Sequence, residues 1–236
     1  MTKDKIEQRP TYSVIVPALN EEEQIGAFIE NIIACIPSCE VIVADGGSTD
    51  QTTKLVLASG GKVIQSKKGR GIQCKTGAGQ ANGDVLVFLH VDSRLVNNIG
   101  EVLQETFLDT PKQVANFSIR FQHSSWKYRL LESLTKVDSI FTRFGDQGII
   151  IKKEFYTKLP FPELPLFEDV AYFRKVRKRT KLHRLPVELA VSVRRFERLG
   201  FFNTHCINTA LMLAFLIGVP VEKLYSWYYK KGNNGK

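Results

Sequence analysis

The sequence predicts an α/β fold in which helices flank a mostly parallel central sheet. The first half of the chain alternates short β-rich apolar stretches with amphipathic ones, an order typical of β-α-β units with right-handed crossovers. Residues 85–89 are apolar at every position, which suits a strand buried on both faces of a parallel sheet. A chain of 236 residues with no internal repeat or obvious linker favours one domain with a C-terminal elaboration.

The first half contains four predicted strands, at 12–17, 40–44, 62–65 and 84–89. Asn20 and Glu23 have the spacing of a capping box, so we expect the first helix to begin at Asn20. Its apolar side chains recur at three- and four-residue steps, at positions 25, 28, 29, 32, 33 and 36. Two more helices are expected, one at 50–59, ended by Gly60 and Gly61, and one within the Gly-rich basic segment 67–82.

The second half is less regular. Strands are expected at 115–121, 147–151 and 182–191, and helices at 126–141 and 168–179. Three prolines between positions 160 and 165 predict an extended loop, because each proline removes a hydrogen-bond donor. Residues 201–217 and 221–229 predict a helical hairpin. Its apolar stretch, 209–219, is shorter than the roughly 20 residues that span a membrane.

The charge balance favours an anionic partner. The chain carries 33 Lys and Arg against 24 Asp and Glu, a net charge of +9, which suits a nucleotide, a nucleic acid or a membrane surface. The alternative is an ordinary basic soluble protein. The four cysteines form no CxxC pair, which argues against a structural zinc site and for thiols in a reducing compartment. The charged N-terminal segment lacks the apolar core of a signal peptide, so we expect a cytoplasmic protein.

Polar motifs follow the first two predicted strands. In VPALNEE, residues 16–22, the start of a helix offers free N–H groups to an anion. In ADGGSTDQT, residues 44–52, Gly46 and Gly47 permit close approach of the backbone to a ligand. Asp45 can accept hydrogen bonds there from a base or a ribose. Well-capped helices and turns are the alternative explanation for both motifs.

Four further motifs carry charge. KKGRG, residues 67–71, combines glycines with cations as a phosphate site does, although neither GxxxxGK[ST] nor GxGxxG is present. Asp92, in LHVDS, follows the buried strand, at the sheet edge where open α/β proteins bind ligands. Glu168 and Asp169 open a helix, where a carboxylate is either a general base or only a favourable charge on the helix dipole. Asp146 lies in GDQG, for which a loop turn is the alternative.

In this order, VPALNEE, DGGSTDQT, LHVDS and FEDV resemble the family 2 glycosyltransferases, which have a GT-A (nucleotide-diphospho-sugar transferase) fold. The resemblance covers residues 12–200. GRGIQCKTGAGQANGD, GDQG and SVRRF, together with LHVDS and FEDV, are further similar to a bacterial subgroup called selenodomain-associated or arsenosugar-biosynthesis transferases. For a single domain over residues 1–236, the resemblance implies a nucleotide-binding half at 11–110, an acceptor half at 111–200 and C-terminal helices at 201–230.

The same resemblance implies a role for each matching residue. Asp92 would bind Mn²⁺ or Mg²⁺ at the two phosphates of a nucleoside-diphosphate sugar. His90, which replaces the first acid of the family's DxD, is a second candidate ligand. Asp169 would take the proton of the acceptor hydroxyl, with Glu168 as orienter or substitute, and Asp146 and Gln147 would lie near the acceptor. The implied donor-binding residues are Pro17, Ala18, Asn20, Glu21, Asp45, Gly46, Gly69, Arg70, Val91, Asp92, Arg194 and Arg195.

We therefore expect an inverting, metal-dependent, hexosyltransferase-like enzyme that moves one sugar to a hydroxyl acceptor by single displacement. The QxxRW motif of processive members is absent. A sugar-phosphate nucleotidyltransferase is the nearest alternative, but it would carry a Gly-rich, Arg-containing loop after the first strand. The other alternative is a non-catalytic basic protein that binds nucleic acid or a membrane surface through the cations of segment 174–181. We expect no nucleic acid, and the C-terminal helices are candidates for core packing, a homodimer interface or contact with the inner face of the membrane.

Overall fold

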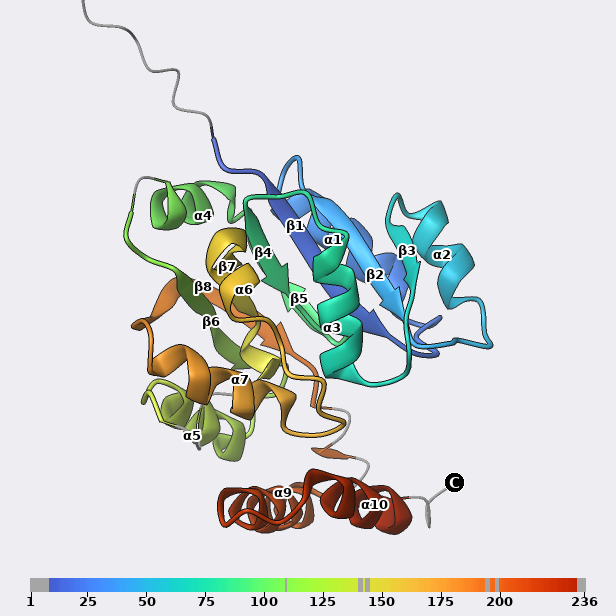
Figure 1. Ribbon diagram of the computed structural model, residues 1–236, viewed down its shortest axis with the longest axis vertical. Helices are drawn as coiled ribbons and strands as arrows, with labels where there is room; N and C mark the ends of the chain where they lie inside the picture. The colour runs from blue at the N-terminus through green and yellow to red at the C-terminus, as the bar shows by residue number, and fades with distance from the viewer. Residues whose placement is uncertain are drawn as a thin grey trace, which may run out of the picture.

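A central sheet organises the computed structural model, which describes residues 9–108, 110–139, 142, 145–193, 196–197 and 200–232 (Figure 1). Within these residues the sheet has eight strands in the order β3-β2-β1-β4-β7-β6-β8-β5. The strands are β1 (Tyr12–Ala18), β2 (Glu40–Asp45), β3 (Lys62–Gln65), β4 (Val85–Phe88), β5 (Ser93–Leu95), β6 (Val114–Phe121), β7 (Ile149–Lys152) and β8 (Leu182–Val191). The helices are α1 (Ile25–Cys35), α2 (Thr52–Ala58), α3 (Arg70–Gly79), α4 (Gly100–Phe107), α5 (Trp126–Thr135), α6 (Lys153–Lys158), α7 (Glu168–Arg177), α9 (Phe201–Leu216) and α10 (Val221–Gly232).

The sheet is parallel in the first half of the chain and mixed in the second. β1 pairs in parallel with β2 and β4, and β2 pairs in parallel with β3, as the alternation of strands and helices predicted. β7 runs antiparallel between β4 and β6, while β6 and β8 are again parallel. The short strand β5 runs antiparallel to β8. The α/β class is therefore confirmed, with antiparallel pairs added by the second half.

Both faces of the sheet are covered. On one face, alternate residues of the central strands, Val14 and Val16 among them, pack in one cluster with α1 and α4. On the other face, Ile15 and Leu86 pack with residues of α3, α6 and α7. Burial on both faces explains why residues 85–89 are apolar without alternation. On α1 the expected stripe is buried apart from Ile33, which is 44% exposed.

Two expected helix starts in the first half are wrong. α1 begins at Ile25, and Gln24 rather than Asn20 occupies its N-cap, so the capping box does not form. Asn20 has a φ of 55°, and its Oδ1 instead accepts a hydrogen bond from the backbone N of Thr49 at 2.9 Å. α2 begins at Thr52, whose backbone N donates to Oδ1 of Asp50 at 2.9 Å. The side chain of Asn20 links its loop to the next one, and that of Asp50 closes a turn. Local hydrogen bonds of this kind compete with helix capping.

The second half differs from the prediction mainly in element ends. α5 ends at Thr135 rather than 141, and positions 140 and 141 lie outside the described residues. β7 begins at Ile149 because residues 145–147 form a short 3₁₀ helix. The strand β5 and the helices α4 and α6 were not predicted. The proline loop and the hairpin of α9 and α10 are confirmed. Among the described residues, no helix combines the length and apolar character needed to cross a membrane.

The glycines of α3 permit close packing. A Cβ atom at Gly77 would lie 2.7 Å from Cγ2 of Ile15 on β1, and one at Gly71 would lie 2.5 Å from the carbonyl oxygen of Pro162. Only a residue without a Cβ atom fits at these two positions. At Gly79, by contrast, no heavy atom lies within 4 Å of the Cβ position. Close packing of α3 therefore accounts for Gly77 and also for Gly71, which we had grouped with a phosphate site.

We predict opposite effects for alanine at two glycines of α3. Gly77→Ala should lower the free energy of unfolding by about 1–3 kcal/mol, because the added methyl group forces α3 away from β1. Gly79→Ala should raise it by up to about 1 kcal/mol, because alanine favours the helix and has room there. Urea unfolding followed by circular dichroism measures both. Equal effects of the two substitutions would contradict the packing described.

Candidate active site

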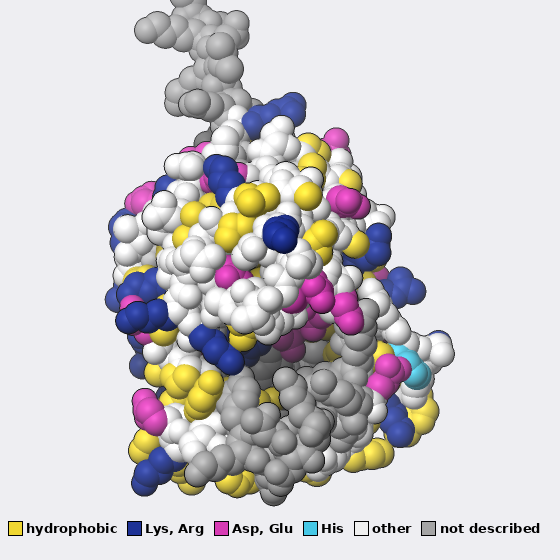
Figure 2. Space-filling model, turned by 90° about the vertical axis from the view of Figure 1, so that its right-hand side faces the viewer, with side chains coloured by type: hydrophobic (Ala, Val, Ile, Leu, Met, Phe, Trp, Pro, Cys, Tyr) yellow, Lys and Arg dark blue, Asp and Glu magenta, His cyan; other side chains and the backbone are white. Residues whose placement is uncertain are grey.

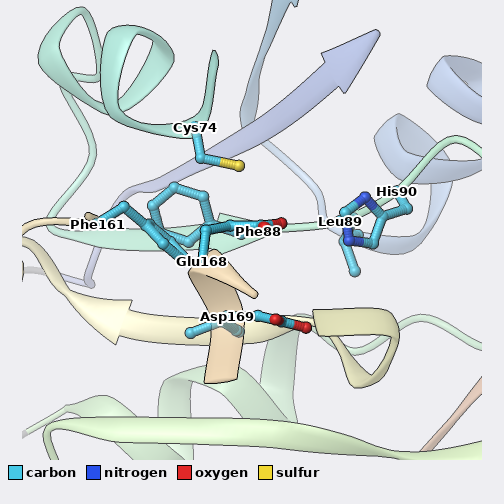
Figure 3. Close-up of a pocket in the computed structure, with 8 residues that line it drawn as sticks. Cys74, Phe88, Leu89, His90, Phe161, Glu168 and Asp169 are labelled. Carbon is cyan, nitrogen blue, oxygen red and sulfur yellow. The ribbon is translucent and has the colours of Figure 1, made fainter. Parts of the chain in front are cut away.

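A small pocket lies where β4 ends. Its volume is about 20 Å³, and its lining residues are Cys74, Phe88, Leu89, His90, Ile149, Phe161, Glu168 and Asp169. Figure 3 shows the carboxylates of Glu168 and Asp169, at the start of α7, pointing to the side of the pocket where the imidazole of His90 lies. A cavity of this size holds about one water molecule. A nucleotide would therefore lie over its mouth rather than inside it.

The turn after β4 presents Asp92 to solvent. The backbone N and the hydroxyl of Ser93 both donate to the carbonyl oxygen of His90, at 3.1 and 2.6 Å. Val91 is buried, whereas Asp92 between Val91 and Ser93 is exposed. The turn thus anchors an apolar side chain in the core and leaves the carboxylate at the rim of the pocket.

An ion pair joins the two halves of the chain at this pocket. Nε of Arg70, the first residue of α3, lies 2.8 Å from Oε1 of Glu168. The side chain of Glu168 is 5% exposed and that of Arg70 is 45% exposed. Burial raises the pKa of Glu168 to about 7, and Arg70 opposes that shift while Asp169 adds to it. Glu168 is therefore held by Arg70 and poised between its protonated and ionised forms.

His90 and Asp92 are part of the same charge cluster. Burial lowers the pKa of His90 and Arg70 lowers it further, which favours the neutral imidazole that can bind a metal. Although Asp92 reaches solvent, the atoms packed around it desolvate its carboxylate and raise its pKa. His90 opposes that rise and Asp146 adds to it. Acids that disfavour one another's ionisation would be stabilised by a divalent cation, so the donor set fits Mn²⁺ or Mg²⁺.

The described residues contain no group of three or more His, Cys, Asp or Glu side chains arranged to hold a metal ion by themselves. The candidate ligands are therefore Asp92 and His90, and further oxygen ligands would come from a bound phosphate and water.

The loops after β1 and β2 form one rim beside the pocket. The backbone N of Asn20 donates to the hydroxyl of Ser48 at 2.9 Å, and the backbone N of Glu21 donates to that of Thr52 at 2.7 Å. Pro17 and Ala18 lie at the end of β1, where Ala18 is buried, and Gly46 donates its N–H to the carbonyl oxygen of Ala18. These expected donor-binding residues are thus gathered at one edge of the sheet.

The carboxylate of Asp45 is hydrogen-bonded within its own loop. It is buried, and its carboxylate accepts hydrogen bonds from the backbone N of Gly47 at 3.1 Å and from the backbone N and hydroxyl of Ser48. These hydrogen bonds order the loop that follows β2, because a buried carboxylate without such donors would be costly. The expected contact of Asp45 with a base stays a prediction.

Gln73 is a central residue of this region that the sequence analysis missed. Its side chain is buried in α3, and its Nε2 donates to the carbonyl oxygens of Ala18 and Ala44, each at 2.8 Å. Its Oε1 accepts from the backbone N of Gly69 at 3.2 Å. Gln73 thereby links the ends of β1 and β2 to the start of α3. A glutamine on the buried side of a predicted helix was the available signal.

The two expected acceptor residues separate. Gln147 is buried, and its Oε1 accepts from Nδ2 of Asn116 at 2.6 Å, so it ties the 3₁₀ helix to β6 instead of facing a pocket. Asp146 is exposed and interacts electrostatically with His90, Asp92 and Glu168.

Gly69, at the N-cap of α3, has a φ of 134°. The remaining two expected donor residues, Arg194 and Arg195, lie outside the described residues.

The raised pKa of Glu168 predicts a pH-dependent stability. Because the folded-state value is about 7 and the usual value is 4.5, the unfolded chain loses this proton first as the pH rises. The quantity of interest is the unfolding free energy of the wild type minus that of Glu168→Gln. This difference should fall as the pH rises from 4.5 to 7 and should not change above pH 7. Denaturant unfolding across this range measures it, with the exposed Glu154→Gln as control. No fall would mean that Arg70 keeps Glu168 fully ionised.

The chain is similar to known glycosyltransferases in sequence. The family model for glycosyl transferase family 2 matches residues 13–165, which include the first four strands, the β4 turn and the 3₁₀ helix. The glucosyl-3-phosphoglycerate synthase of Mycolicibacterium paratuberculosis is 37% identical over 98 residues, which cover 37% of this chain and 29% of that protein. The 4,4'-diaponeurosporenoate glycosyltransferase of Staphylococcus haemolyticus is 29% identical over 99 residues, which cover 39% of this chain and 26% of that protein. Each match spans less than a third of the relative's length.

Solved structures share the fold. Glucosyl-3-phosphoglycerate synthase from Mycobacterium tuberculosis, in complex with Mn²⁺, UDP and phosphoglyceric acid, superposes with a TM-score of 0.63 at 23% identity, over 89% of this chain and 80% of that one. S. aureus TarS 1–349 in complex with UDP gives a TM-score of 0.62 at 20% identity, over 78% and 60% of the two chains. These likenesses show a GT-A fold. With the family model matching most of the chain as well, the protein belongs to glycosyl transferase family 2.

Proposed function

We propose that the protein is an inverting, metal-dependent glycosyltransferase that moves a sugar from a nucleoside-diphosphate sugar to a hydroxyl acceptor by single displacement. The observation that carries the proposal is the meeting, at one pocket, of His90 after β4 with Glu168 and Asp169 at the start of α7. Asp92, in the same turn as His90, interacts electrostatically with it. Open α/β sheets bind ligands at this edge, beyond the carboxyl ends of the strands.

The proposed donor is a UDP-sugar, because the solved relatives hold UDP, one of them with Mn²⁺. The rim formed by Pro17, Ala18, Asn20 and Glu21, with Asp45 and Gly46, would hold the base and ribose. Its internal hydrogen bonds fix the rim before a donor arrives. Gly69, Arg70, Val91 and Asp92, with Arg194 and Arg195, would surround the diphosphate.

Asp92, with His90 as a second candidate, would hold Mn²⁺ or Mg²⁺. A bound divalent ion supplies charge stabilisation to the leaving diphosphate. Arg70 lies beside this position and can share the same charge, since its side chain is 45% exposed while its Nε pairs with Glu168.

Asp169 is the proposed general base. Its carboxylate takes the proton of the acceptor hydroxyl while the hydroxyl oxygen bonds to the anomeric carbon. The bond from that carbon to the diphosphate oxygen breaks and the diphosphate leaves with the electron pair, which inverts the configuration. Glu168 is already held by Arg70 at 2.8 Å, so it serves as the orienting partner rather than the base.

The finer assignments are part of this proposal. The resemblance to selenodomain-associated or arsenosugar-biosynthesis transferases suggests the subgroup, and the proposed acceptor is a hydroxyl compound rather than nucleic acid. A single domain, with a nucleotide half at 11–110, an acceptor half at 111–200 and helices at 201–230, fits the continuous sheet. Four free cysteine thiols fit a reducing cytoplasm. The C-terminal helices are candidates for contact with the inner face of the membrane and for a homodimer interface.

Two alternatives are less well supported. A sugar-phosphate nucleotidyltransferase would carry a Gly-rich, Arg-containing loop after β1, where this chain has Pro17 to Glu21. Release of pyrophosphate from UTP and a sugar 1-phosphate would favour it. A non-catalytic nucleic-acid binder would use the basic residues of α7, and its binding would fall steeply with salt.

We predict that Asp169→Asn abolishes transfer but not donor binding. Asparagine keeps the shape of the side chain but takes no proton, so UDP release from UDP-glucose with a panel of hydroxyl acceptors should fall at least about a hundredfold. The thermal shift with UDP and Mn²⁺ should stay that of the wild type. Glu154→Gln, an exposed acid on α6, is the control. Normal turnover of Asp169→Asn would remove it from the role of base.

We predict that Asp92→Ala separates metal from nucleotide binding. Loss of the carboxylate should weaken the Mn²⁺-dependent part of UDP binding at least about tenfold, as loss of metal-site groups usually does. A thermal-shift titration of UDP with and without Mn²⁺ measures this, again with Glu154→Gln as the control. If Asp92→Ala kept the full Mn²⁺-dependent shift, the metal would be bound elsewhere.

A further inference from the structure

The outer side of α9 is uncharged and carries large exposed apolar side chains. None of its sixteen residues is Lys, Arg, Asp or Glu, so the helix presents no charge over a length of about 24 Å. Phe202, Leu213 and Ile217 are all exposed, and Ile217 is 81% exposed. Their spacing of eleven and four residues places them on one side of the helix. Such a helix side usually faces another apolar phase.

α5 repeats this arrangement. Trp126, Leu130, Leu134 and Val137 are exposed, at spacings of four, four and three residues, and Trp126 is 68% exposed. The opposite side of α5 holds Tyr128, which is buried against Phe121 with ring centroids 5.5 Å apart. The apolar stripe of α5 therefore points away from the core.

The two helices meet at their N-termini. Nζ of Lys127 lies 4.8 Å from the ring centroid of Phe202, and Tyr128 packs edge-on against Phe201 at 5.3 Å. Figure 1 places α5, α9 and α10 at the same end of the molecule, and Figure 2 shows hydrophobic side chains with Lys and Arg among them along that end. We call this surface the α5–α9 face. Its members are Trp126, Leu130, Leu134, Val137, Phe202, Leu213 and Ile217.

Cations border the α5–α9 face. Arg129 on α5 and Lys136, the residue after α5, are exposed, and Lys127 lies on the other side of the apolar stripe. The basic end of α7 is tied to the same region, because Nη2 of Arg177 pairs with Oδ1 of Asp138 at 2.8 Å. The exposed cations of that segment are Arg174, Lys175, Lys178, Arg179 and Lys181. An apolar strip bordered by Lys and Arg matches the layers of an anionic lipid surface.

We propose that the α5–α9 face docks on the surface of an anionic lipid bilayer. The apolar side chains enter the boundary between headgroups and acyl chains, and the bordering cations contact the headgroup phosphates. A second copy of the chain is a poorer occupant, because a two-fold contact would bring the same cations together in a protein that carries +9 overall. The inference stands independently of the proposed transfer reaction.

The helix α9, which carries part of the docking face, also contacts the residue that precedes α7. The ring of Phe215 on α9 stacks on that of Phe167 with centroids 5.0 Å apart, and Phe167 directly precedes Glu168. Phe167 has a φ of 59°, a conformation that neighbouring contacts must hold in place. A residue of α9 is therefore in contact with the residue that directly precedes the two acids of α7.

Vesicle binding tests the proposal directly. The full chain is mixed with vesicles of phosphatidylcholine alone or with about one third phosphatidylglycerol, and the bound fraction is measured by flotation. We expect binding to the anionic vesicles, weaker at high salt, and little to the neutral ones. The two tryptophans of the chain, Trp126 and Trp227, lie at this end of the molecule and are both exposed. Their emission should shift to shorter wavelength on binding.

Surface variants make the test specific. Leu213→Gln with Ile217→Gln, and separately Trp126→Gln with Leu130→Gln, should each lower vesicle affinity about tenfold or more, because these side chains enter the lipid. Leu57→Gln on α2, at a side chain that is 63% exposed on another element, is the matched control and should bind as the wild type does. Arg129→Gln with Lys136→Gln should weaken binding to anionic vesicles only.

Three results would overturn the proposal: no binding to anionic vesicles, binding that the face variants leave unchanged, or a stable dimer in solution that Leu213→Gln with Ile217→Gln converts to monomer without any vesicle binding. The thermal shift with UDP and Mn²⁺ is measured on the same variants. It should be unaltered, so that failure of docking and failure of the proposed transfer are told apart.

Discussion

The candidate site depends on the contact between the start of α3 and the segment that leads into α7. Gly71 has no Cβ atom, which leaves room for the carbonyl oxygen of Pro162 against the helix. This close approach lets Arg70 reach the buried carboxylate of Glu168. A buried carboxylate needs such a partner, because desolvation without one is costly. One packing contact therefore joins the two halves of the chain and places Asp169 beside the end of β4.

The candidate site combines a hydrogen-bonded rim with a group of acids. On the side of the loops after β1 and β2, the side chains of Asp45, Asn20 and Gln73 form hydrogen bonds with loops and strand ends. These bonds give the rim a fixed shape. On the other side, burial raises the pKa of Asp92 and the nearby charge of Asp146 adds to that rise. A rigid rim beside concentrated negative charge suits a donor that arrives with a divalent cation, since the cation offsets both the acids and the phosphates.

The sequence was sufficient for the strands of the first half and for the acids at their ends, because local periodicity and turn residues determine both. It was insufficient where distant segments decide. β5 has three residues and forms only by pairing with β8. Asn20 matches a capping box, yet its side chain bonds to Thr49 in another loop. Gln147 follows an acid in a polar motif, but Asn116 on β6 holds it in the core. For α5 the sequence predicted a helix without showing that Leu130 and Leu134 face outward.

A crystal structure of the protein with UDP and Mn²⁺ tests the central claim most directly. We expect the diphosphate at the mouth of the pocket, the ion in contact with a carboxylate oxygen of Asp92, and the uracil against the rim of Pro17 and Ala18. A more open groove, lined by Arg120, Arg129 and Glu188 among other residues, is a separate surface. UDP and Mn²⁺ bound in that groove, with the end of β4 left empty, would contradict the assignment of the site.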